Sequence, residues 1–389
     1  MDPSRFTSGR TGELRQIAQP KKDWAFIPAE LPTDWDFDPS LWPLLVEAKE
    51  ALGTLNGIGQ TLPNPDLLLR PLQSREAITS SKIEGTHVTP EQLLLYQLDP
   101  REPKQADDKA SDWFEVFNYS AALNHGRSLL QDLPICNRVI REMHAILMRG
   151  VRGRNKNPGE FRKWQVQIGS SGRFLPPPPQ EIDRLMTNLE KCVNSAESRY
   201  DPLVRSYLIH YQFEAVHPFG DGNGRVGRSL LALMIYKWLG HSMPWLYMSA
   251  FFERYKDEYI DKLFKVSTEG AWTPWIEYCL RGTIDQANDS VRRCHSFNRL
   301  RLEFPNRLNS HSPRTCQIIE GLFTTPLVTV GTIAEKYDIT YPTARSDIDR
   351  LIEARILVES ADSYPKSFLS AEIMKVAYGD FEAEVAPAE

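Results

Sequence analysis

Cysteine is scarce in this sequence of 389 residues, and the spacing of the five cysteines rules out a CxxC pair: Cys136, Cys192, Cys279, Cys294 and Cys316. The usual cysteine-rich zinc modules are therefore excluded, and the thiols resemble the reduced cysteines of cytosolic proteins. Long apolar runs are also missing, and none approaches the length of a membrane span. Because the polar start, MDPSRFTSGRTGE, has no apolar signal-peptide core, we expect a cytoplasmic protein with no membrane partner.

Net charge is small as well. The formal charge of −5 gives the chain no general attraction to nucleic acid or to an anionic membrane. Hydrophobic residues make up 41% of the chain and charged residues 25%, which is the balance of a globular protein with a sizeable core. A chain of this length is expected to form one large or two medium domains.

One short stretch, Val216–Arg228, concentrates the chemistry of the chain. It reads V-HPFGDGNGRVGR and lies between two segments whose apolar residues recur every three or four positions. Both segments are therefore predicted helices, and the polar stretch falls at the N-terminus of the second. At that point unpaired backbone N–H groups and the helix dipole attract an anion.

The residue types in this stretch fit a phosphate site. Gly222 and Gly224 lack side chains that would hold an anion away from the helix amides, as in a phosphate-binding nest. Arg225 and Arg228 lie three residues apart, so they share a helix face and can both reach a polyphosphate. Asp221 supplies a hard oxygen ligand suited to Mg²⁺.

His217 is the group in this stretch that can take up a proton near neutral pH. A lone histidine near a helix end is usually structural, and a lone Gly-rich loop is usually a plain turn. A turn, however, requires neither the paired arginines nor the carboxylate. The combination therefore favours a site for a polyphosphate with a general base beside it.

The same stretch resembles the signature of the Fic family, His-Pro-Phe-x-Asp/Glu-Gly-Asn-Gly-x-x-x-Arg with an arginine after the second glycine. Every specified position is present: His217, Pro218, Phe219, Asp221, Gly222, Asn223, Gly224, Arg225 and Arg228. The resemblance implies an enzyme that transfers AMP from ATP, with Mg²⁺, to a Ser, Thr or Tyr hydroxyl of a target protein. Self-modification stays open. A kinase-like branch of the family carries Lys where this chain has Gly224, so Gly224 favours AMP transfer.

The resemblance also implies roles for the individual residues. His217 accepts the proton of the target hydroxyl as that hydroxyl attacks the α-phosphorus, and Asp221 holds Mg²⁺. Asn223 fixes the loop and can donate a hydrogen bond to the α-phosphate. The remaining phosphate contacts are those of the amides around Gly222 and Gly224, of Arg225 with the inner phosphates, and of Arg228 with the γ-phosphate.

Residues 66–85 form a second informative segment, a predicted helix that ends in SSKIEG. Gly85 fits the left-handed position after a helix C-terminus. Glu84 is unfavourable there because the negative end of the helix dipole repels it, so it is either solvated or paired with a cation. Ser80-x-x-x-Glu84-Gly85 resembles the inhibitory motif of Fic proteins whose inhibitory helix precedes the core. In that class the glutamate pairs with the second motif arginine, here Arg228.

Residues 164–174 read as a hairpin, because Trp164, Val166 and Ile168 alternate with polar residues before a Gly-rich turn. The segment resembles the Fic flap, whose exposed edge pairs with an extended stretch of the target. That resemblance implies target-binding positions at Val166, Gln167, Ile168 and Gly169. A plain surface hairpin is the alternative that the sequence leaves open.

We therefore expect a mainly α fold: a Fic-type helical bundle with a short β-hairpin flap, plus a C-terminal winged helix–turn–helix domain. Within the core, Ser249–Val266 is expected as one helix. It carries Tyr259 roughly where family members place an aromatic near the nucleotide, although aromatics at helical spacing more often belong to the core. The expected parts are a lead-in over 1–40, an N-terminal helical region over 41–110, a Fic core over 111–295, a connector over 296–312 and the winged-helix domain over 313–389.

The C-terminal part carries the wrong charge for DNA. Residues 313–389 contain seven Lys and Arg against thirteen Asp and Glu, a net charge of −6, whereas phosphate neutralisation requires a positive surface. Contact with a protein, including a homodimer, is therefore favoured over DNA binding.

Three other functions stay open at this stage. Glu84 could activate water to remove AMP from a modified protein. The anion site could serve phosphocholine or another nucleotidyl group. A winged-helix transcription regulator with a Fic-derived domain is the non-enzyme alternative, and the intact motif argues against it.

Overall fold

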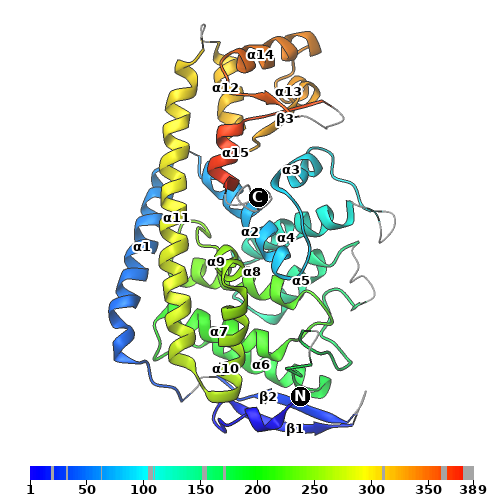
Figure 1. Cartoon of the computed structure of the whole chain (residues 1–389), viewed down its shortest axis with the longest axis vertical. Coiled ribbons are helices and arrows are strands. Elements are labelled where there is room, and N and C mark those ends of the chain that lie inside the picture. Colours follow the sequence, from blue (N-terminus) through cyan, green and yellow to red (C-terminus); the bar gives the residue numbers. More distant parts are fainter. Residues whose placement is uncertain are drawn as a thin grey trace, which may run out of the picture.

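The computed structural model describes residues 1–18, 22–31, 34–62, 64–103, 108, 110–150, 156–169, 172–308, 312–360 and 366–379, and it is mainly helical, as predicted (Figure 1). The N-terminal part contains η1 (Pro3–Arg5), β1 (Gly12–Ile17), β2 (Asp23–Pro28), η2 (Pro39–Leu41), α1 (Trp42–Thr61), α2 (Asp66–Ile83) and α3 (Pro90–Leu98). The central part contains α4 (Ala110–Leu129), α5 (Asn137–Leu147), α6 (Pro179–Asn194), α7 (Pro202–Val216), α8 (Asn223–Trp238), α9 (Ser249–Arg254), α10 (Lys256–Glu269) and α11 (Trp272–Asn306). The C-terminal module contains α12 (Pro313–Leu322), β3 (Leu327–Thr329), α13 (Val330–Lys336), α14 (Tyr341–Glu353), β4 (Val358–Glu359), β5 (Ser367–Leu369) and α15 (Ala371–Tyr378).

Helices α7 and α8 lie at the centre of the bundle. Both are buried on almost every side, as expected for helices whose apolar residues are not confined to one stripe. Helix α8 packs against α7, α4, α5 and α2, so the α7–α8 junction is supported by several elements that are far apart in sequence. The polar stretch therefore sits on a rigid scaffold.

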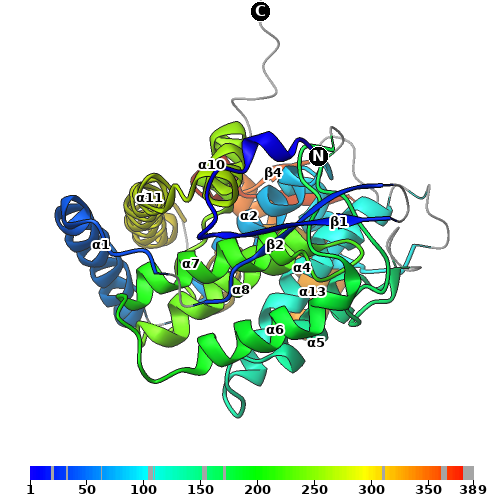
Figure 2. The ribbon, with the colours of Figure 1, turned by 90° about the horizontal axis from the view of Figure 1, so that it is seen from below.

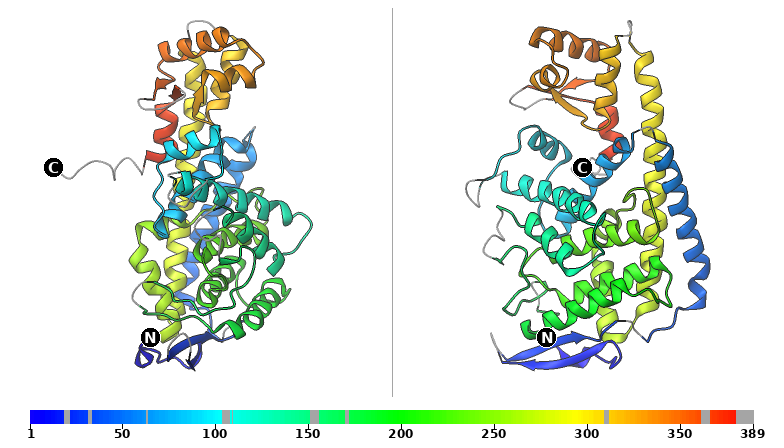
Figure 3. Two further views of the ribbon diagram at one scale, coloured as in Figure 1. Left: turned by 90° about the vertical axis from the view of Figure 1, so that its right-hand side faces the viewer. Right: turned by 180° about the vertical axis from the view of Figure 1, so that it is seen from behind.

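Helix α11 runs the length of the molecule, with α1 packed along its outer side (Figures 1 and 3). Its 35 residues span about 50 Å at the rise of an α-helix. The segment expected as a connector, 296–312, is helical as far as Asn306. Phe297, Leu300 and Phe304 keep the helical spacing there and are buried, partly against Phe323 of the C-terminal module. That apolar contact explains why the helix continues.

The lead-in over 1–40 is more ordered than predicted. Strands β1 and β2 form an antiparallel pair that lies across the underside of the bundle (Figure 2). Phe26 of β2 is 1% exposed and packs with Phe6, Phe174 and Phe264. Trp35 stacks on Tyr200 with 5.8 Å between the ring centroids, so Phe26 and Trp35 both anchor this segment to the rest of the protein.

One local prediction is wrong and another is confirmed only in part. The helix expected over Ser249–Val266 is broken at Tyr255, whose φ of −117° and ψ of 43° separate α9 from α10. The hairpin expected over 164–174 contains no regular strand among the residues described, only an isolated antiparallel bridge between Ile168 and Phe174. Ser170 and Ser171 of its turn lie outside the described residues.

The C-terminal module contains a three-stranded antiparallel sheet in the order β3-β5-β4. Strand β5 pairs with β4 on one side and with β3 on the other. Helix α15 packs against α11 and α2, which brings the end of the described chain back to the bundle (Figure 1). The winged-helix assignment stays a prediction. None of the helices in the described ranges is long and apolar enough to cross a membrane.

Candidate active site

The α7–α8 junction is a tight loop held by its own side chains. His217 follows α7 in the left-handed conformation, with φ 49° and ψ 60°, which is uncommon for a residue other than glycine. Gly222 precedes α8 with φ 75° and ψ 8°. The Asn223 side chain accepts a hydrogen bond from the Phe219 N–H (2.8 Å) and donates one to the Phe219 carbonyl (3.0 Å). The loop-fixing part of the role expected for Asn223 is thus visible in the geometry.

His217 is half-buried and has the protonation state that a general base requires. Burial and the nearby Arg162 charge lower its pKa to about 4, so the imidazole is neutral at pH 7. Its Nδ1 lies 3.4 Å from the Glu214 carbonyl, a group that can only accept. This contact favours a proton on Nδ1 and leaves the Nε2 lone pair available to accept one.

Arg162 also supports this loop, although no pattern in the sequence singles it out. Its guanidinium is 2% exposed and is surrounded by backbone carbonyls. It donates to the carbonyls of His217 (2.8 Å), Trp164 (3.0 Å) and Pro177 (2.6 Å). Burial lowers the pKa of Arg162 to about 10, which still leaves it charged at neutral pH. One side chain therefore joins both ends of the 164–177 segment to the His217 loop.

His144 of α5 supports the other end of the loop and was also missed. Its ring is fully buried and stacks on Phe219, with 3.7 Å between centroids and 6° between planes. Its Nδ1 accepts a hydrogen bond from the Gly159 N–H (2.8 Å), and its Nε2 lies 3.0 Å from the Asp221 carbonyl, to which it donates. Burial lowers the pKa of His144 to about 4, so this neutral tautomer is the stable form.

The two glycines at the start of α8, Gly222 and Gly224, have no room for side chains. A Cβ placed on Gly224 would lie 2.2 Å from Oε1 of Glu84 and 2.8 Å from Nη1 of Arg228. A Cβ on Gly222 would lie 2.9 Å from the Met148 sulfur, and the Gly222 N–H already donates to Asp221 Oδ1 at 2.6 Å. The Glu84 carboxylate thus lies directly over the helix turn that the sequence marks as a phosphate site.

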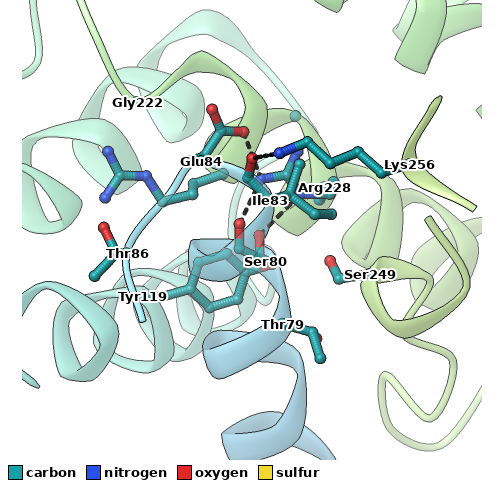
Figure 4. A network of polar contacts seen from close by, with 12 residues as sticks. Thr79, Ser80, Ile83, Glu84, Thr86, Tyr119, Gly222, Arg228, Ser249 and Lys256 are labelled. Atoms are coloured by element: carbon teal, nitrogen blue, oxygen red, sulfur yellow. Dashed lines mark hydrogen bonds and ion pairs between the residues drawn. The ribbon is translucent and has the colours of Figure 1, made fainter. Parts of the chain in front are cut away.

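Arg228 joins α8 to the end of α2 (Figure 4). Its Nη2 donates to Glu84 Oε1 (2.8 Å) and to the Ser80 carbonyl (2.8 Å), and its Nε donates to Ser80 Oγ (2.9 Å). Burial disfavours the Glu84 carboxylate, but the charge and hydrogen bond of Arg228 outweigh that cost, and the pKa of Glu84 is lowered. The ion pair expected between Glu84 and Arg228 is therefore formed.

A second cation explains how Glu84 is tolerated at the C-terminal end of α2. Lys256 Nζ donates to the Ile83 carbonyl at 2.7 Å, so a positive charge caps the helix beside Glu84 (Figure 4). Gly85 follows with φ 94°, the left-handed conformation predicted for it. Two cations and a glycine thus stabilise this helix end.

Arg225 faces a carboxylate that the sequence did not indicate. Its Nη1 forms an ion pair with Glu115 of α4, and its Nη2 lies 3.7 Å from Asp221 Oδ1. Glu115 also accepts a hydrogen bond from Thr86 Oγ1 at 2.8 Å, just beyond α2. The Arg225 guanidinium is 5% exposed and is held by Glu115, so a contact with phosphate requires it to share or exchange that partner.

The remaining predicted residues lie further from the junction. Gln167 and Gly169 are exposed and Val166 and Ile168 are half-buried, so the 166–169 segment lies at the surface. Tyr259 of α10 is only 4% exposed.

The donor set for a metal ion consists of one carboxylate. Among the described residues no group of three or more His, Cys, Asp or Glu side chains is arranged to hold a metal. The Asp221 side chain is 49% exposed at the mouth of the junction. A single carboxylate fits Mg²⁺, which keeps several waters and takes phosphate oxygens for its other positions.

Comparisons with known proteins identify the region around this site. Residues 42–128 match the family described as Fic/DOC family N-terminal, and residues 134–235 match the Fic/DOC family. The chain is 30% identical over 131 residues to the protein adenylyltransferase Fic of Aedes aegypti, covering 33% of this chain and 24% of that one. It is 28% identical over 179 residues to the protein of the same name from Drosophila grimshawi, covering 44% and 34%.

The fold comparison covers more of the chain. A Fic family protein from Desulfovibrio desulfuricans G20 aligns with a TM-score of 0.58 at 21% identity, covering 87% of this chain and 97% of that one. The two chains thus share a fold well beyond the two matched regions. The chain spans about a quarter to a third of the length of the curated relatives above.

Proposed function

This chain belongs to the Fic/DOC family through residues 42–128 and 134–235, and we propose that it is a protein adenylyltransferase, the activity named in its relatives. The observation that carries the proposal is the pairing of a neutral His217 with the start of α8, where Gly222 and Gly224 carry no side chain. A neutral imidazole can accept a proton, and the helix N-terminus can bind the phosphates on which the chemistry occurs.

In the proposed reaction ATP binds with its phosphates along the first turn of α8. Nε2 of His217 takes the proton of a Ser, Thr or Tyr hydroxyl on the target protein. The hydroxyl oxygen bonds to the α-phosphorus, the bond from that phosphorus to the bridging oxygen of the β-phosphate breaks, and pyrophosphate leaves. Positioning and electrostatic stabilisation supply most of the rate in such transfers.

Each remaining residue of the motif has a part in holding the phosphates. Arg228 is proposed to bind the γ-phosphate and Arg225 the inner phosphates, with Asn223 keeping the loop in shape. Asp221 would hold Mg²⁺, which neutralises phosphate charge when bound. His144 and Arg162 keep the two ends of the loop in place through the contacts described above.

We further propose that the enzyme is autoinhibited by Glu84. Arg228 cannot serve Glu84 and a γ-phosphate at once, and Glu84 Oε1 also covers Gly224. An ATP molecule bound beside Glu84 would lack its outer anchor, and its α-phosphate would be misaligned for attack. Displacement of the end of α2, or loss of the Glu84 carboxylate, would then allow productive binding.

The test is transfer of label from α-labelled ATP to protein. We expect labelling by the Glu84→Gly variant and none by the Glu84→Gly/His217→Ala double variant. Equal labelling by both would count against His217 as the base. A panel of labelled nucleotides and of a phosphocholine donor would show which group the site transfers.

Removal of AMP is a second candidate, favoured by the state of Glu84. The carboxylate is ionised and lies over the phosphate turn, where it could activate a water molecule toward a phosphodiester. Incubating an AMP-modified protein with the wild type and with Glu84→Gly would separate the two activities. Release of AMP by the wild type alone would support removal.

A further inference from the structure

Arg225 is bonded on one side of its guanidinium only. Its Nη1 donates to Oε1 of Glu115 on α4, and the two side chains form an ion pair. Its Nη2 lies 3.7 Å from Asp221 Oδ1, beyond hydrogen-bond distance. Its Nε is buried and has no hydrogen-bond partner in the described part of the chain. Because Nε and Nη2 form the edge that donates two parallel hydrogen bonds to a phosphate, the phosphate-binding edge of Arg225 is the unpaired one.

Glu115 is well placed to hold the other side of the guanidinium. The residue is 7% exposed, and its neighbours Phe114 and Val116 lie in the core. Oε1 of Glu115 also accepts a hydrogen bond from Thr86 Oγ1 at 2.8 Å, so two donors converge on one oxygen. Helix α4 packs against α8. The carboxylate therefore comes from the bundle core and does not depend on the Glu84 side chain for its position.

We propose that Glu115 is a positioning residue that keeps the Nε–Nη2 edge of Arg225 directed at the inner phosphates of the bound nucleotide. The proposal rests on the function proposed above. A buried N–H without a partner costs free energy, and a phosphate at this edge would remove that cost. Without Glu115, Asp221 is a carboxylate that Nη2 already approaches. Pairing with Asp221 would turn the edge away from the phosphates and engage the expected Mg²⁺ ligand.

Two variants of equal charge test the position of the acceptor in the Glu84→Gly chain. Glu115→Gln keeps an oxygen that can accept from Nη1, whereas Glu115→Leu removes it, and both remove the negative charge. We expect Glu115→Leu to bind a fluorescent ATP analogue about tenfold more weakly than Glu115→Gln, the scale of one hydrogen bond to a charged group. A fluorescent ADP analogue should show the same ratio, because ADP keeps the inner phosphates.

Asp347→Leu is the matched control. Asp347 is 1% exposed and pairs with Arg314 Nε at 2.6 Å in the C-terminal module, so this change also removes a buried ion pair, away from Arg225. We expect the affinity for both analogues to stay unchanged. Should Glu115→Leu fail to fold, Glu115→Asp decides, since it keeps the charge and draws the acceptor back by one methylene. It should bind both analogues several-fold more weakly than the Glu84→Gly parent, and equal binding would overturn the proposal.

A double-mutant cycle shows whether Glu115 acts through Arg225. In a Glu84→Gly/Arg225→Ala chain, Glu115→Gln and Glu115→Leu should bind the analogues equally, since the residue through which Glu115 acts is gone. Equal binding with Arg225 present, or the same tenfold ratio in its absence, would overturn the proposal. AMP transfer is measured separately: chains that bind both analogues but label no protein would count against the proposed function alone.

Discussion

Oε1 of Glu84 lies 2.8 Å from Nη2 of Arg228 and would lie 2.2 Å from a Cβ on Gly224. One carboxylate oxygen thus neutralises the outermost arginine of the site and covers the helix turn beside it. Under the proposed function, the Glu84 carboxylate at the end of α2 lies where the phosphates of the nucleotide would bind. Competition between two anions for one arginine is a direct form of switch, because any group that displaces one of them admits the other.

The Glu84→Gly change should raise AMP transfer to protein by about tenfold or more, since tenfold corresponds to roughly 1.4 kcal/mol of released competition. Labelling by α-labelled ATP measures it. Glu253→Ala is the matched control, because Glu253 pairs with Lys82 at the same end of α2 (3.1 Å) without contacting Arg228 in the described structure. Lower labelling by Glu84→Gly than by the wild type would contradict autoinhibition.

Gly224→Ala should affect stability with a sign that depends on Glu84. In the wild type the added methyl group meets the Glu84 carboxylate and the Arg228 guanidinium, so we expect a lower melting temperature. In the Glu84→Gly chain that carboxylate is gone and the end of the Arg228 side chain, released from its ion pair, can move aside. The higher helix propensity of alanine, worth about 0.5–1 kcal/mol, should then make the same change neutral or stabilising. Calorimetry of the four chains measures the coupling. Equal shifts in both backgrounds would show that Glu84 does not lie over Gly224.

The sequence predicts the parts of this site that follow a pattern. The helices on both sides of Val216–Arg228 were predicted because their apolar residues recur at helical spacing, and α7 and α8 match them closely. The Glu84–Arg228 pair came from a resemblance, since residues 144 positions apart give no local signal of contact. The break at Tyr255 was missed because a helix period does not reveal a backbone kink without Gly or Pro.

Arg162 and His144 show why the other residues of the site could not be predicted from the sequence. Both act through backbone carbonyls or amides of residues remote in sequence, and any residue type can supply such a partner. Each is a single polar residue that becomes fully buried only in the folded chain. Similarly, α15 was missed because its stability comes from α11 and α2: Arg293 of α11 donates to the Val376 and Ala377 carbonyls at its end (2.5 and 3.0 Å).

The low pKa of His217 predicts the pH dependence of the reaction. The base must be neutral, and a pKa of about 4 places the loss of activity near pH 4 instead of near pH 6.5. The negative charge of Glu84 raises the pKa of His217. Removing Glu84 therefore does not move the acidic limb of the pH–activity profile to a higher pH. The measurement is kcat/KM of the Glu84→Gly chain from pH 5 to 8. Glu214, whose pKa burial raises to about 7, is the other group that titrates beside the site, and Glu214→Gln serves as the control.

A limb near pH 6.5 that persists in the Glu214→Gln chain would contradict the burial of His217. A limb near pH 7 that disappears with Glu214 would instead identify that carboxyl as its source. The two outcomes are distinguishable because the Glu214→Gln change leaves the charge of Arg162, the main cationic neighbour of His217, in place.

His144 predicts how folding stability depends on pH. Its pKa is about 4 in the folded protein and about 6.5 when unfolded, so the unfolded chain binds more protons between those values. The free energy of unfolding therefore gains a term that is complete above pH 6.5 and is lost as the pH falls toward 4. Glu76 and Glu214, whose pKa values burial raises, act in the opposite direction, so the total slope does not isolate one residue.

The His144→Gln variant isolates the contribution of His144 to the pH dependence of folding stability. Its amide nitrogen can still donate to the Asp221 carbonyl from the place of Nε2, but glutamine does not titrate. Urea unfolding between pH 4.5 and 7 should show a wild-type stability that rises with pH more steeply than that of the variant, by up to about one proton. His125→Gln is the control, since His125 is 38% exposed and pairs with Glu142 at the surface. Parallel curves for the wild type and His144→Gln would mean that His144 takes up a proton as readily in the folded protein as in the unfolded chain, and the contact that orients the Asp221 carbonyl would then have to be reassigned.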